Sequence, residues 1–186
     1  MMVRLVVAIG NPGKAYNFSR HNVGFLLAEW LVRELGGPAF KPFSKCVSLM
    51  TKVDSPSTSE SLVFIKPETY VNLSGKAVLA AKKFFSLSPE HILVLADDVN
   101  RDFGDVRLRY QAGSGGHKGI KSIVASLGSN LFWQLRLGVG RPDNRAVGLS
   151  DFVLGDFSCE EKEQLPACFA QAGTLFQQWC VGAESA

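Results

Sequence analysis

The stretch VRLVVAIGNPGKAYNFSRHNVGF, residues 3–25, decides how the fold begins and raises the question of function. Its first seven residues are rich in β-branched side chains and almost uninterruptedly apolar, which is typical of a strand buried on both faces. From Asn22 onward, apolar residues recur at helical spacing as far as the Gly-Gly-Pro sequence at 36–38, so an amphipathic helix is predicted there. The polar connection between strand and helix contains His21 and is either an ordinary turn or the location of a catalytic base.

The rest of the chain alternates between strand-like and helix-like segments. Strands are expected at 46–53, 61–67, 91–98, 105–110 and 133–142, and helices at 69–89, 120–129 and 158–179. Pro166 indicates a break or a late start in the last helix, and the Ser-rich loop at 54–61 should be a mobile hairpin tip. We therefore predict one α/β domain, residues 1–186, with helices on both faces of a twisted mixed, largely parallel sheet.

The composition fits a globular α/β protein of this size. Of the 186 residues, 46% are hydrophobic and 20% are charged. No apolar run approaches the ~18–20 residues of a membrane helix, and the start of the chain lacks the cleavage site of a signal peptide. The four cysteines form no CxxC pair and the chain has only three histidines. We therefore expect free thiols, no metal and a reducing cytoplasmic location.

Charge is distributed unevenly along the chain, whose net charge is +3. Residues 101–145 contain eight Lys or Arg against three Asp or Glu, whereas residues 146–186 contain one against six. The cationic segment suggests an anionic partner, most often one that carries phosphate. The alternative is that these basic residues solvate unrelated faces, and the sequence leaves both possibilities open.

Polar side chains follow two predicted strands at their carboxyl ends, where ligands gather in α/β sheets. Asn11 follows the first strand, and Asp97 and Asp98 end a later one. A histidine at the start of a helix is more often structural, but His21 becomes a general base if one of these acids orients its ring. The chain has no GxSxG and no cysteine in a glycine-rich strand-to-helix turn. A His–Asp pair that activates water for attack on an ester is therefore the preferred interpretation.

Two asparagines carry amides that can donate to a carbonyl oxygen or accept from a peptide N–H. Pro12 fixes its own φ and Gly13 permits a positive φ, so the Asn11 side chain would be held in place. Asn11 as a simple turn former and Asn72 as a local helix cap are the alternatives.

The glycine-rich stretch GSGGHKG, residues 113–119, leads into a predicted helix. It fails the GxGxxG pattern because the sixth position is Lys118, and GxxxxGK[ST] is absent from the chain. Dinucleotide binding and nucleoside triphosphate hydrolysis therefore have little support. Backbone N–H groups at the helix start could still hold a phosphate or an oxyanion, with Lys118 and Lys121 nearby and His117 as a substrate contact. A tight turn with surface lysines is the alternative.

Five motifs, in this order and spacing, resemble those of bacterial peptidyl-tRNA hydrolases. They are GNPGKAY…RHNVG, KPETYVNLSGKAV, ILVLADDV, GSGGHKGIKSI and LRLGVGRP. The resemblance covers nearly the whole chain and implies a monomeric α/β enzyme without metal or cofactor. The implied substrate is peptidyl-tRNA released early by the ribosome, and the bond cleaved is the ester between the peptide and the 3′ end of the tRNA.

The same resemblance implies roles, position by position. His21 would be the catalytic base, Asp97 its partner acid, and Asn11 the side chain that orients water or substrate. Substrate-binding roles would fall on Tyr16, Tyr70, Asn72, His117 and Lys118. Arg109 and Arg136 match the basic pair that holds the tRNA 5′ phosphate.

The chain departs from the family pattern most clearly at Lys118, where asparagine is usual. Lysine donates but cannot accept, and it places a charge beside the catalytic centre, where it could contact a 3′-end phosphate. Tyr70-Val71 in place of Phe-Met is a milder change. Because residues 146–186 are acidic, tRNA contacts should come mainly from residues 101–145.

Two rival interpretations remain from the sequence. One is a non-catalytic RNA-binding protein on the same fold, and the other is a small-molecule hydrolase or phosphorylase-like enzyme of similar architecture. The presence of Asn11, His21, Asn72 and Asp97 argues against the first, and the second would not need the basic segment.

Overall fold

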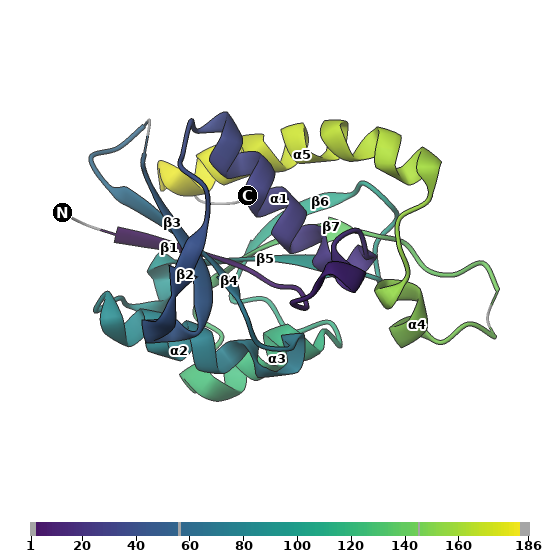
Figure 1. Cartoon of the computed structure of the whole chain (residues 1–186), viewed down its shortest axis with the longest axis horizontal. Coiled ribbons are helices and arrows are strands. Elements are labelled where there is room, and N and C mark those ends of the chain that lie inside the picture. The colour runs from purple at the N-terminus through teal and green to yellow at the C-terminus, as the bar shows by residue number, and fades with distance from the viewer. Residues whose placement is uncertain (1–2, 56, 145, 183–186) are drawn as a thin grey trace.

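A computed structural model describes residues 3–55, 57–144 and 146–182, which form a central sheet between two layers of helices (Figure 1). The strands are β1 (Val3–Ala8), β2 (Lys41–Phe43), β3 (Ser48–Asp54), β4 (Ser61–Pro67), β5 (Ile92–Asp98), β6 (Val106–Tyr110) and β7 (Trp133–Gly138). Their order in the sheet is β2-β3-β4-β1-β5-β7-β6. The predicted mixed sheet is confirmed, and its parallel part consists of the four central strands β4, β1, β5 and β7.

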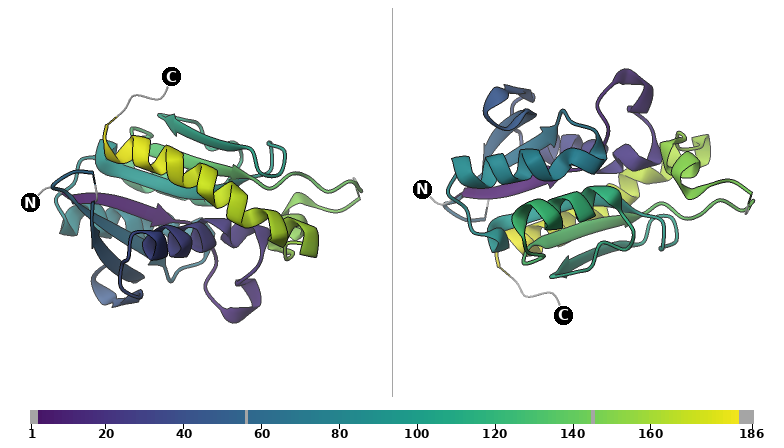
Figure 2. Two further views of the ribbon diagram at one scale, coloured as in Figure 1. Left: turned by 90° about the horizontal axis from the view of Figure 1, so that it is seen from above. Right: turned by 90° about the horizontal axis from the view of Figure 1, so that it is seen from below.

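Helices cover both faces of this sheet, as predicted. The α-helices are α1 (Val23–Glu34), α2 (Ser74–Phe84), α3 (Lys118–Leu127), α4 (Leu149–Leu154) and α5 (Cys159–Cys180). Short 3-10 turns are η1 (Lys14–Tyr16), η2 (Arg20–Asn22), η3 (Ser44–Cys46), η4 (Val71–Leu73) and η5 (Pro89–His91). Figure 2 shows α1 and α5 on one face and α2 and α3 on the other. Among the described residues, no helix is both long and apolar enough to cross a membrane.

Strand β1 shows how the sequence produces two cores. Its side chains alternate between the faces of the sheet, since successive residues of a strand point to opposite sides. Val6 and Ala8 pack in the core under α1 and α5, whereas Leu5 and Val7 pack in the core under α2 and α3. All four are fully buried, which explains why the strand is apolar on both faces.

Several element boundaries differ from the prediction. The segment expected as a helix at 69–89 contains η4 followed by α2, and the positive φ of Ser86 (53°) lies between the end of α2 and Pro89. Helix α4 and the short strand β2 were not predicted. The loop expected at 54–61 does connect β3 to β4; Pro56 within it lies outside the described residues, and the mobility of the loop stays a prediction.

Helix α5 passes through Pro166 without a break, which resolves an open alternative. It starts at the capping box in which Ser158 Oγ accepts from the Glu161 N–H at 3.1 Å, while Glu161 Oε2 accepts from the Ser158 N–H at 2.6 Å. Pro166 cannot donate to the Lys162 carbonyl four residues earlier. Both residues are exposed, so water can satisfy that carbonyl.

The four cysteines provide a test of the packing. Cys46, Cys168 and Cys180 are buried, Cys159 is exposed, and none forms a disulfide in the structure. Burial raises the pKa of the Cys180 thiol to about 12 and also raises the pKa values of Cys46 and Cys168.

Because the thiolate is the reactive form, iodoacetamide at pH 8 should label Cys159 alone in the native protein. Mass spectrometry should show one label natively and four in denaturant; rapid native labelling of Cys180 would contradict this packing.

Candidate active site

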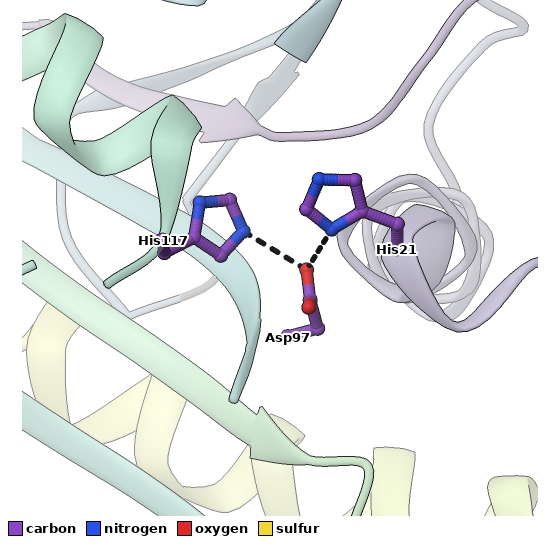
Figure 3. Close-up of side chains that lie close together, drawn as sticks. All are labelled: His21, Asp97 and His117. Carbon is purple, nitrogen blue, oxygen red and sulfur yellow. Dashed lines mark hydrogen bonds and ion pairs between the residues drawn. The ribbon is translucent and has the colours of Figure 1, made fainter. Parts of the chain in front are cut away.

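The carboxyl ends of β1 and β5 bring three predicted side chains together (Figure 3). His21 lies in η2, Asp97 near the end of β5, and His117 immediately before α3. Asp97 Oδ1 lies 2.8 Å from His21 Nδ1 and 2.9 Å from His117 Nε2. The centroids of the two imidazole rings are 4.9 Å apart. One carboxylate oxygen therefore bridges two histidines from distant parts of the chain.

Close backbone packing places His21 beside Asp97. Helix α1 begins against the ends of β1 and β5, because a Cβ on Gly24 would lie only 2.5 Å from the Leu95 carbonyl oxygen and 2.7 Å from that of Ile9. Leu95 is two residues before Asp97 on β5. A side chain at position 24 would push the start of α1 away, and His21 with it.

Hydrogen bonds fix which nitrogen of His117 carries a proton. His117 Nδ1 accepts from the Gly119 N–H at 3.0 Å as the N-cap of α3. In the neutral ring the proton therefore lies on Nε2, which donates to Asp97. His21 donates to the same oxygen from Nδ1, and its Nε2 remains available to accept a proton. His21, Asp97 and His117 have the spacing of a metal-binding group, but the two nitrogens that face Asp97 carry protons, so the donor set fits hydrogen bonding better than metal ligation.

Asp97 is held as a carboxylate in this arrangement. It is 3% exposed, and burial by itself would raise its pKa. The charge of His117 when protonated, together with the hydrogen bonds from His117 and His21, outweighs burial and holds the pKa of Asp97 well below its usual range. The Asp97 carboxylate therefore lies next to the ring of His21, where its negative charge stabilises the imidazolium form.

The structure also shows which of the two adjacent acids pairs with histidine. Asp98 points elsewhere: its Oδ2 lies 3.3 Å from Arg136 Nη1 and its Oδ1 accepts from the Asn100 N–H at 2.9 Å. Neighbouring residues on a strand point to opposite sides, so only one of them can face His21. Asp97, as predicted, is that residue.

Asn11 is held in place on both sides, as its GNPG turn suggested. Asn22 accepts from the Asn11 N–H at 2.8 Å and donates to the Asn11 carbonyl at 3.0 Å. The side-chain oxygen of Asn11 accepts from the Val71 N–H at 2.9 Å. Its Nδ2 is thereby left as a donor beside the cleft. Gly13 has a φ of 111°, which confirms the expected role of this glycine in the turn.

A cleft of about 490 Å³ opens over these groups. The predicted site residues that line it are Asn11, Tyr16, His21, Tyr70, Asn72, Asp97, His117, Lys118 and Arg136. Arg109 does not line it. One wall was missed by the sequence analysis: the apolar side chains Leu149, Val153 and Leu154 of α4. Their segment of the chain is too short to show a clear helical period, and only the tertiary structure places it over the cleft.

Arg20 also has a role that was not predicted from the sequence. Its guanidinium pairs with Glu161 at 2.7 Å and lies 4.3 Å from the centroid of the Phe152 ring. The Arg20 N–H donates to the Gly155 carbonyl at 3.0 Å. The residue before His21 therefore joins η2 to α4 and to the start of α5, which positions the α4 wall relative to His21.

The two predicted phosphate-binding arginines occupy different environments. Arg109 is exposed on β6, and none of the hydrogen bonds or ion pairs found among the described residues involves its side chain. Arg136 on β7 is only 11% exposed and bonds to Asp98, to Gln134 and to the Gly113 carbonyl at the start of the glycine-rich stretch. Arg136 is thus engaged inside the protein, while Arg109 is free to meet an anion.

Comparisons with known proteins agree with this geometry. Residues 5–186 match the family described as Peptidyl-tRNA hydrolase. The chain is 63% identical to a peptidyl-tRNA hydrolase of Chlamydia pneumoniae over 96% of this chain and 98% of the relative, and 57% identical to one of Chlamydia abortus over the full length of both. The crystal structure of a peptidyl-tRNA hydrolase from Acinetobacter baumannii superposes with a TM-score of 0.88 at 31% identity, covering 98% of this chain and 91% of that one.

Proposed function

Since the chain belongs to the peptidyl-tRNA hydrolase family, we propose that it hydrolyses the ester of peptidyl-tRNA with His21 as general base on water. The observation that supports this most directly is the 2.8 Å hydrogen bond between His21 and the buried carboxylate of Asp97. It orients the ring so that Nε2 is the nitrogen available to take a proton.

The reaction needs one proton transfer in each direction. His21 Nε2 removes a proton from water as the oxygen attacks the ester carbonyl, and Asp97 stabilises the resulting imidazolium. The tetrahedral intermediate then expels the 3′ oxygen of the terminal ribose, which takes the proton back from His21. The products are tRNA with a free 3′ hydroxyl and a peptide carboxylic acid, which loses its proton to solvent and becomes a carboxylate.

The asparagines and their neighbours supply binding rather than proton transfer. Asn11 Nδ2 is placed to donate to the ester carbonyl oxygen, whose negative charge grows in the intermediate. Asn72 is exposed at the cleft and can bind peptide backbone without selecting side chains. Tyr16 and Tyr70 flank the substrate, and the exposed ammonium of Lys118 would contact a phosphate near the 3′ end.

Arg109 and Arg136 should differ in their effects when replaced by alanine. Arg109→Ala is expected to weaken tRNA binding and to reduce the slope of log affinity against log salt concentration by about one, because one phosphate contact is lost. Hydrolysis of a minimal peptidyl-nucleotide ester should be unchanged. Arg136→Ala should impair both substrates, because it also releases Asp98 and the Gly113 carbonyl. Kinetics on both substrates at several salt concentrations provide the measurement. Equal losses on both substrates for Arg109→Ala would remove it from the phosphate site.

A single assay separates the proposed function from its rivals. Purified protein incubated with N-acetyl-aminoacyl-tRNA and with longer peptidyl-tRNA should release free tRNA without added metal or cofactor. We propose that the protein acts as a monomer and that its substrate is cytoplasmic. A non-catalytic RNA-binding protein would bind the tRNA and release nothing. A small-molecule hydrolase would cleave simple esters, and tRNA would not compete.

A further inference from the structure

A second cavity, of about 290 Å³, lies next to the catalytic cleft. Asn11 lines both cavities, so they meet at the GNPG turn. Its volume is close to the lower end of the range for small-ligand sites, about 300–1,000 Å³. Apolar side chains form much of its wall, among them Phe18, Leu26 and Leu49. None of the roles proposed above uses this space.

The borders of the two cavities are continuous along the chain. Tyr16 borders the catalytic cleft, and the next two residues, Asn17 and Phe18, border the second cavity. On the other side, Tyr70 borders the cleft and Glu68 the second cavity. Asn11, which lines both cavities, connects them at the GNPG turn. An extended chain bound at Asn11 can therefore run from one cavity into the other.

A buried lysine gives the second cavity a polar group. Lys66, at the end of β4, is 8% exposed and lines the cavity. Its ammonium bonds to Glu29 Oε1 at 2.5 Å and lies 4.6 Å from the centroid of the Phe40 ring. An ammonium group has three donors, and this bond to Glu29 is the one hydrogen bond that the described residues give it. Two donors remain for an acceptor in the cavity.

We propose that the second cavity is a subsite for the part of the substrate peptide that lies N-terminal to the residue esterified to tRNA. Lys66 donates to backbone carbonyl oxygens of that segment, which every peptide sequence provides. The apolar walls receive side chains without selecting among them. This inference rests on the proposed function, whose substrate carries a peptide of arbitrary length that has to leave the cleft.

The test compares substrates of different peptide length. N-acetyl-aminoacyl-tRNA reaches only the catalytic cleft, whereas a hexapeptidyl-tRNA also reaches the second cavity. The wild type should cleave the longer substrate with a higher kcat/KM. Lys66→Met should lower kcat/KM for the hexapeptide substrate about tenfold, the effect of losing one hydrogen bond to a charged group, and leave the short substrate within about twofold.

Three further variants separate binding from structural support. Glu29→Gln breaks the ion pair but keeps the ammonium, so the length dependence should persist. Leu49→Trp fills the cavity and should reproduce the Lys66→Met result, while Leu131→Trp, at a 41% exposed position outside both cavities, should not. Equal rates for both lengths in the wild type, or equal losses in Lys66→Met and Glu29→Gln, would overturn the subsite. Absence of cleavage of even the short substrate would instead refute the proposed function.

Discussion

Replacement of His21 by alanine should lower the kcat for peptidyl-tRNA hydrolysis by at least ~10²–10⁴-fold, the usual contribution of a general base. The variant has no group in place of Nε2 to take the proton from water. KM should change little, because the peptide and the tRNA are held by other residues. The fold should persist, since the α1 start is fixed by the close packing of Gly24 and not by the imidazole ring. Asp97 also keeps its hydrogen bond from His117.

The chain offers a matched control for this experiment. His91 lies in η5, bonds to Ser88 at 2.9 Å and does not line the catalytic cleft, so His91→Ala should retain wild-type kcat. Circular dichroism and thermal melting establish that both variants are folded. A folded His21→Ala protein with nearly wild-type turnover would rule out the general-base mechanism.

The central strands and the helix that follows the first strand could be predicted from sequence because their patterns are local. The continuous apolar run at 62–65, for example, is typical of a strand buried within a sheet. Helix α4 could not be predicted, because its six residues are stabilised by contacts such as that of Phe152 with Arg20 and not by their own periodicity. In α5 the capping box is a local feature, because Ser158 and Glu161 lie three residues apart, but whether Pro166 would interrupt the helix depended on its exposure.

The pairing of His21 with Asp97 was predictable for a different reason. Parallel strands end at the same edge of the sheet, so polar residues after β1 and β5 had to meet if those strands were neighbours. The sequence could not reveal that His117 donates to the same oxygen as His21, because that depends on the N-cap geometry of α3. The sequence also could not show that Arg136 forms an ion pair with Asp98, since the two residues belong to different motifs.

Asp97→Asn should reduce kcat by about 10²–10⁴-fold, although the new side chain is nearly identical in shape. Asparagine removes the negative charge that stabilises the imidazolium of His21. Its NH2 group can also donate to His21 Nδ1, which would move the ring proton to Nε2, the nitrogen that must accept from water. The adjacent acid is the control: Asp98 is similarly buried but pairs with Arg136. Asp98→Asn should therefore have a clearly smaller effect on kcat.

The low pKa of Asp97 adds a prediction for stability. Because its pKa in the folded state lies below the unfolded value of about 3.9, the carboxylate stabilises the fold above that value, and this stabilisation is lost as the pH falls. Urea unfolding of wild type and Asp97→Asn should therefore differ most near pH 5, and the difference should shrink toward pH 2. A difference that grows on acidification would mean that Asp97 is protonated in the native protein. His21 would then lack the charged partner that its role as a base requires.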